Sequence, residues 1–168
     1  MRHWYLMVPL VLVCGTAMAA DRWTYFADPA GAFTIAVPDA PVEGHSTSPG
    51  ADGKPIDMTS YAIERGDGAL AVVISDLSRV TDNGHLLEDG VASIKASAAG
   101  GFSDAPIKVD GHAGHEVHFA DKNGVKFEDR MFLFGTKLYQ LMAVLPPGSN
   151  AEDAATAQRF LGSIHFLK

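Results

Sequence analysis

Short runs of β-favouring residues, separated by turn residues, constrain the fold of this chain more than any other feature. Side chains alternate between the two faces of a strand, so a run in which apolar residues alternate predicts a strand with one buried face. The runs lie at residues 23–26, 33–37, 58–63, 69–74, 107–109, 115–120, 125–134 and 137–145. Gly66-Asp67-Gly68 and Asn123-Gly124 are typical of tight hairpins. We therefore expect about eight strands, mostly joined in hairpins.

Residues 84–98 have helical periodicity instead. Their apolar positions are three or four residues apart and fall on one helical face: Leu87, Val91, Ile94 and Ala98. Asp82 or Asn83 can cap the first turn, and Gly100-Gly101 can end the helix in the left-handed region. This pattern predicts an amphipathic helix packed on one side.

A second helix is predicted after Pro146-Pro147-Gly148. Ser149 and Glu152 are spaced as in a capping box. The apolar positions that follow share one face: Ala154, Ala157, Phe160, Leu161 and Ile164.

Strands joined as hairpins, without a helix after each one, exclude a doubly wound parallel sheet. The expected class is α+β: a single antiparallel sheet of seven to eight strands, flanked by two main helices.

The segment from Gly44 to Lys54 is rich in Ser, Pro and Gly, and we interpret it as an exposed loop. Loops carried by a rigid sheet are common places for binding contacts. This segment is therefore the expected contact surface if the protein acts by binding a partner.

The N-terminus has the three parts of a secretory signal peptide. A basic start at Arg2 precedes the apolar run 4–13, and small residues end the segment. Ala17 and Ala19 suit signal peptidase, so we predict cleavage after Ala19. A retained anchor is disfavoured because ten apolar residues span only about half of a bilayer core. The prediction is a signal peptide at 1–19, a single domain at 20–168, and a periplasmic or secreted protein without a transmembrane span after cleavage.

Cys14 is the single cysteine of the chain and lies inside the predicted leader. A lipoprotein cleavage site is a second interpretation of this residue, but such sites have a small residue before the cysteine and here Val13 occupies that place. Cleavage after Ala19 removes Cys14, so we expect no disulfide and no thiolate ligand in the exported protein.

The charge balance excludes a nucleic-acid partner. The 168 residues include 13 Lys+Arg and 20 Asp+Glu, for a formal net charge of −7. Affinity for a phosphate backbone comes from a basic face that releases counterions, and an acidic chain lacks the charge for it.

Four stretches resemble PsbP-like domains, in the same order along the chain. They are the opening 25–42 with Phe33-Thr34-Ile35-Ala36-Val37-Pro38, the stretch 109–116, the hairpin 130–141 and the closing 157–164. The resemblance implies an antiparallel sheet flanked by helices. It also implies a binding or accessory protein more than an enzyme, because the family includes an extrinsic subunit of the photosynthetic water-splitting complex and, in the same superfamily, a small Ran-binding protein.

One cluster could bind a metal ion. His112, His115, Glu116 and His118 lie within seven residues, and imidazole and carboxylate are ligands for zinc or copper. Alternation along a strand places Glu116 and His118 on one face and His115 on the other. His112, in a Gly-flanked turn, can reach either face. The sequence therefore offers two possible pairs of metal ligands, Glu116 with His118 or His112 with His115, and neither pair alone closes a metal site. The alternative is that these histidines are solvated surface side chains.

No catalytic motif is present in the sequence. A Gly-x-Ser-x-Gly elbow and a phosphate-cradling glycine loop are both missing. Asp121, Glu128 and Asp129 could form an acid/base pair, but we expect carboxylates that flank a hairpin turn to be solvated. Four aromatic residues could line an apolar cleft, with core packing as the alternative: Trp23, Tyr25, Phe26 and Tyr139.

Two functions remain open from the sequence. The leading one is an exported, non-catalytic binding or accessory protein of the bacterial envelope, with an envelope or periplasmic protein as its partner and no cofactor. The alternative is a periplasmic metal- or small-ligand-binding protein that uses His112, His115 and His118, with zinc or copper as the metal.

Overall fold

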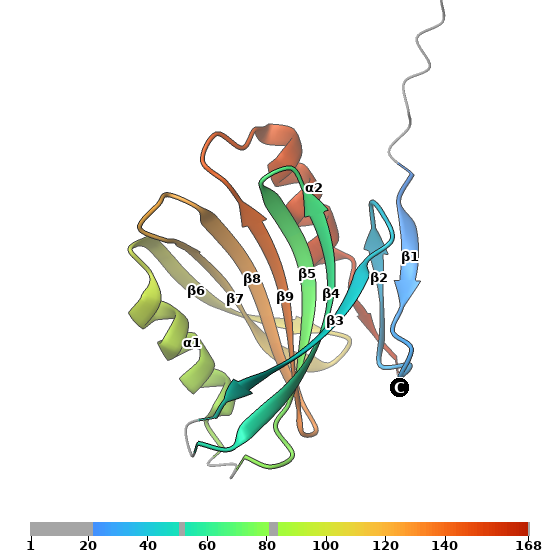
Figure 1. Cartoon of the computed structure of the whole chain (residues 1–168), viewed down its shortest axis with the longest axis vertical. Coiled ribbons are helices and arrows are strands. Elements are labelled where there is room, and N and C mark those ends of the chain that lie inside the picture. The colour runs from blue at the N-terminus through green and yellow to red at the C-terminus, as the bar shows by residue number, and fades with distance from the viewer. Residues whose placement is uncertain (1–21, 51–52, 81–83, 168) are drawn as a thin grey trace, which may run out of the picture.

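A computed structural model describes residues 22–50, 53–80 and 84–167, which form two antiparallel sheets and two helices (Figure 1). The larger sheet has seven strands in the order β3-β4-β5-β9-β8-β7-β6. Their bounds are β3 (Val42–Pro49), β4 (Pro55–Arg65), β5 (Gly68–Asp76), β6 (Gly100–Val109), β7 (His112–Ala120), β8 (Lys126–Phe134) and β9 (Lys137–Leu145). Each neighbouring pair is antiparallel, and five of the six pairs join strands that are consecutive in the chain, the exception being β5 with β9.

The smaller sheet has three strands in the order β1-β2-β10. β1 (Thr24–Ala27) and β10 (His165–Phe166) pair with opposite edges of β2 (Phe33–Val37). Both ends of the described chain therefore meet in one small sheet, which lies beside the larger one (Figure 1).

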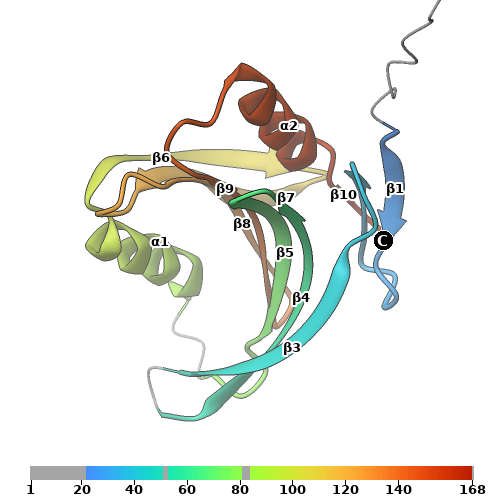
Figure 2. The ribbon, with the colours of Figure 1, turned by 45° about the horizontal axis from the view of Figure 1, so that its top comes forward.

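The two helices lie on different faces of the seven-stranded sheet. α1 (Leu86–Ser97) lies inside the curve of the sheet, where Val91 packs with Val117 and Met131 (Figure 2). α2 (Ala151–Gly162) packs on the opposite face with β2, and its Phe160 joins the larger core cluster. The larger core therefore lies between the seven-stranded sheet, the small sheet and α2.

The predicted class, an α+β fold with a large antiparallel sheet and two helices, is confirmed. The number of sheets differs from the expectation, because β1 and β2 do not join the edge of the large sheet. Phe33, Ile35 and Val37 of β2 are instead buried against the face of that sheet. Alternation in sequence shows that one face of a strand is buried, but it is the same whether the strand extends a sheet or stacks on it.

The expected loop from Gly44 to Lys54 is wrong over most of its length. Residues Val42–Pro49 form β3, which pairs with β4 along all eight positions. β3 is an edge strand with mostly exposed side chains. Its polar composition therefore fits an edge strand, whose backbone hydrogen bonds come from β4 and whose side chains remain in water.

The helix boundaries also differ from the predicted ones. α1 begins after His85, which makes no side-chain capping bond, while Asp82 and Asn83 lie outside the described residues. It ends at an extended Ala98, and Gly100-Gly101 open β6 instead of stopping the helix.

α2 has the predicted capping box, but one residue later. Asn150, not Ser149, is the N-cap, and it exchanges hydrogen bonds with Asp153 rather than Glu152. Asn and Ser are equally good caps and Asp153 is one residue from Glu152, so composition did not decide the register.

The predicted signal peptide, 1–19, lies outside the described residues. Within the part of the chain that the structure describes, neither helix is long and apolar enough to cross a membrane.

Candidate functional site

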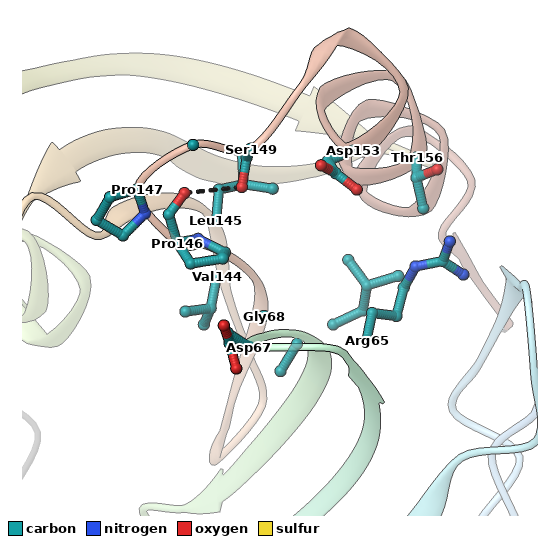
Figure 3. A pocket seen from close by; sticks show the side chains of 13 residues that line it. Arg65, Asp67, Gly68, Val144, Leu145, Pro146, Pro147, Ser149, Asp153 and Thr156 are labelled. Carbon is teal, nitrogen blue, oxygen red and sulfur yellow. Dashed lines mark hydrogen bonds between the residues drawn. The ribbon is translucent and has the colours of Figure 1, made fainter.

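A pocket of about 250 Å³ lies among the first turns of α2, the β4–β5 turn and the segment that connects β9 to α2 (Figure 3). One wall is the β4–β5 turn with Arg65 and Asp67, and the other is the segment after β9 from Pro146 to Ser149. These walls are distant in sequence. They meet because β5 and β9 are neighbours in the sheet, with Ala69 opposite Val144.

Apolar residues of β5 and β9 form part of the pocket lining. Leu70 and Leu145 lie there, and both are buried in the core cluster. Gly68 allows β5 to approach β9, since a Cβ at this position would lie 2.6 Å from the Val144 carbonyl oxygen. Gly148, with φ of +90°, occupies the left-handed region that glycine adopts without strain.

Arg65 is the cation of the pocket. Its side chain is exposed, extends toward α2 in Figure 3, and forms no hydrogen bond or ion pair with the described residues. Its five N–H donors are therefore available to an incoming acceptor.

The other polar groups around the pocket are mostly committed to local structure. Ser149 donates its hydroxyl to the Pro146 carbonyl oxygen at 2.8 Å, and Asp153 accepts from the Asn150 N–H at 2.9 Å. Asp67 is exposed on the β4–β5 turn. The residues that line this pocket include neither histidine nor cysteine, so Ser149 has no base beside it. This arrangement can hold a ligand that combines apolar surface with a hydrogen-bond acceptor.

The structure does not bring the predicted metal ligands together. His115 lies 2.7 Å from the Asp104 carboxylate through Nδ1, and His118 lies 3.8 Å from Glu116 on the other face of β7. His112 packs against Phe134 with ring centroids 4.1 Å apart. It is the first residue of β7 rather than part of a turn, because the turn is formed by Asp110 and Gly111, which both have positive φ.

No group of three or more metal-ligating side chains forms among the residues that the structure describes. Glu116 instead forms an ion pair with Arg130, from Oε1 to Nη2 at 2.7 Å. Arg130 also donates to the Leu161 carbonyl oxygen at 3.0 Å. Both side chains are mostly buried. Glu116 therefore fixes the arginine that connects the sheet to α2.

The three carboxylates considered for acid/base chemistry do not converge. Asp121 accepts from the backbone N–H groups of Asn123 and Val125 and shapes the β7–β8 turn. Glu128 accepts a hydrogen bond from Gln158 of α2 at 2.7 Å. Asp129, the next residue, points to the opposite face of β8.

The expectation that Asp129 is solvated is wrong. Its side chain is 1% exposed, and it accepts one hydrogen bond, from Gln140 at 2.7 Å. Its Oδ1 atom is buried without a hydrogen-bond partner among the described residues. Burial raises the pKa of Asp129 to about 7, which the Gln140 hydrogen bond only partly offsets.

The aromatic residues are divided between core and surface. Tyr139 and Phe26 pack in or against the larger core cluster, whereas Tyr25 is 75% exposed. Trp23 is covered by the guanidinium of Arg159, 4.3 Å from the ring centroid. These four residues do not line one cleft.

The fold and the pocket define the class of this protein, a small α+β domain with an antiparallel sheet and an open surface pocket, and its fold is PsbP-like. The structure is similar to the solution structure of cyanobacterial PsbP (CyanoP) from Synechocystis sp. PCC 6803, with a TM-score of 0.57. The match covers 90% of this chain and 96% of that chain at 12% sequence identity. A likeness at this identity shows the shared fold. A scan against protein-family models and a search of curated proteins both find no match.

Proposed function

We propose that this protein is an exported, non-catalytic binding module of the bacterial envelope, and that it holds a partner protein through the pocket beside α2. The observation that carries the proposal is the guanidinium of Arg65, which has no partner among the described residues and belongs to a pocket whose lining includes Leu70 and Leu145. Pockets that bind ligands combine a mostly apolar lining with a few polar groups that fix orientation.

Three further observations support this function. The leader pattern at residues 1–19 predicts export. The fold is shared with cyanobacterial PsbP, in agreement with the binding or accessory role that the sequence resemblance implies. The Ser149 hydroxyl donates to the Pro146 carbonyl oxygen and the Asp153 carboxylate accepts from the Asn150 N–H, which supports a structural role for both groups at the start of α2.

The proposal of export is tested by the mass of the protein isolated from the periplasm or the medium. We expect a chain that begins at Ala20. A protein that remains in the membrane fraction with residues 1–19 attached would contradict export.

Binding is tested by capture from envelope extract with tagged wild-type protein and two charge-reversal variants. We expect Arg65→Glu to lose a partner that the wild type retains reproducibly. Arg79→Glu is the matched control, because Arg79 is an exposed arginine outside the pocket, 3.5 Å from Asp57. Equal capture by all three proteins, or no reproducible capture by the wild type, would contradict the proposal.

A further inference from the structure

The two edges of the seven-stranded sheet are built differently. The β6 edge has three features that oppose pairing with another strand. Pro106 lies within the strand and lacks an N–H, the register shifts between Gly100 and Ser103, and Lys108 is exposed near the end. This edge is protected against strand addition.

The β3 edge has none of these features in its interior. β3 pairs with β4 on one side along all eight residues, and in the described part of the chain no strand pairs with its other side. It contains no lysine or arginine, its register is regular, and Pro49 is its last residue. Figure 2 shows β3 along the free margin of the curved sheet. Its outward backbone groups can therefore pair with an added strand.

An acidic groove adjoins the start of this edge. It has a volume of about 470 Å³ and is lined by three carboxylate residues, Asp39, Glu43 and Glu64, without a lysine or arginine. Val42, which is 73% exposed, adds apolar surface. Ser60 of β4 also lines the groove, and its hydroxyl lies over Gly44, where a Cβ would be 2.9 Å from the Ser60 Oγ atom.

We propose that the β3 edge binds an extended, lysine- or arginine-bearing segment of another protein as an added strand, with its basic side chains over the acidic groove. The edge supplies backbone hydrogen bonds, and the carboxylates select the charge of the segment. A second copy of this chain does not fit, because the protein is acidic overall, at −7, and its own β3 carries Glu43. This surface is separate from the pocket of Arg65, so the two proposals succeed or fail independently.

The test measures binding of three end-blocked peptides to the purified protein by fluorescence anisotropy. The first alternates lysine with valine or threonine over about nine residues. The second has glutamate in place of lysine, and the third has a central proline that prevents pairing as a strand. We expect the first to bind at least about tenfold more tightly than either of the others. Equal affinity for the lysine and glutamate peptides, or no binding of the lysine peptide, would overturn the proposal.

Two further measurements locate the site. Hydrogen exchange of the wild type should slow within residues 42–49 when the lysine peptide binds, and protection confined to other strands would overturn the assignment. The Glu43→Lys/Glu64→Lys variant should bind at least about tenfold more weakly, because the groove changes sign. The matched control, Glu88→Lys/Glu152→Lys, reverses two exposed charges on the helices and should bind as the wild type does. A dimer of the free protein in light scattering would also contradict the proposal, since it would assign the edge to a second copy.

Discussion

At the scale of single residues, the buried carboxyl group of Asp129 is the most unusual feature of this protein. Because burial raises its pKa to about 7, the folded protein keeps a proton on Asp129 at pH values where the unfolded chain has lost it. The contribution of this group to stability is therefore fully present below about pH 4 and falls as the pH rises toward 7.

This behaviour gives a prediction for Asp129→Asn, which cannot ionise. The stability of the variant relative to the wild type should increase between pH 5 and 8 by as much as about 3 kcal/mol, because about two of the three units between the unfolded and folded pKa values lie in this range. Urea unfolding of both proteins at several pH values measures this difference. The other titrating groups are common to the two proteins, so their contributions cancel in the comparison. Parallel profiles of stability against pH for the two proteins would contradict a raised pKa at Asp129.

Arg130 provides a second prediction at this scale. Arg130→Met leaves Glu116 without its closest cation and the Leu161 carbonyl without this donor. Loss of one partner of a mostly buried pair costs about 3 kcal/mol. The double variant Glu116→Gln/Arg130→Met should recover part of this loss, because no unpaired charge remains. Urea unfolding measures both, and a double variant less stable than Arg130→Met would contradict this account.

At the scale of elements, the approach of β5 to β9 depends on Gly68. Gly68→Ala places a Cβ 2.6 Å from the Val144 carbonyl oxygen and should destabilise the protein by about 1–3 kcal/mol. Gly100→Ala is the matched control, because no atom lies within 4 Å of a Cβ at that position. Thermal unfolding compares the two, and equal midpoints would show that the strands can move apart without cost.

The start of α2 gives another prediction at this scale. Asn150→Ala should cost about 1 kcal/mol, because the Asn150 side chain accepts from the N–H groups of Glu152 and Asp153. Ser149→Ala should cost less, since Ser149 caps no N–H of the helix in this structure. A larger loss for Ser149→Ala in urea unfolding would favour the register that the sequence first suggested.

Sequence patterns predicted most elements but not their caps or the edge strand. The strands at 33–37 and 137–145 are predicted with their observed bounds because β-favouring apolar residues are dense there and turn residues bound both runs. β3 was missed because an edge strand buries little and its polar residues look like a loop. Asp129 was misplaced although it lies between Phe127 and Met131 on the same face, which is a pattern that indicates burial.

At the scale of the whole molecule, the arrangement of the sheets and of the pocket could not be read from the sequence. Residues from the segments 65–70 and 144–156 line one pocket because β5 and β9 are neighbours, and no local pattern encodes that pairing. The resemblance to PsbP-like domains did predict the fold, since the order of its motifs carries long-range information that a single strand does not. It could not indicate Arg65, which lies outside the matching stretches.

The most direct test of the account is photo-crosslinking in living cells from a probe at Asp67, on the rim of the pocket, and from a control probe at Ala92, which is exposed on α1. The account predicts one recurring envelope protein crosslinked from position 67, absent from position 92, and lost when Arg65 is replaced by Glu. The same products from both positions, or products that are unchanged by Arg65→Glu, would contradict the claim that this pocket holds the partner.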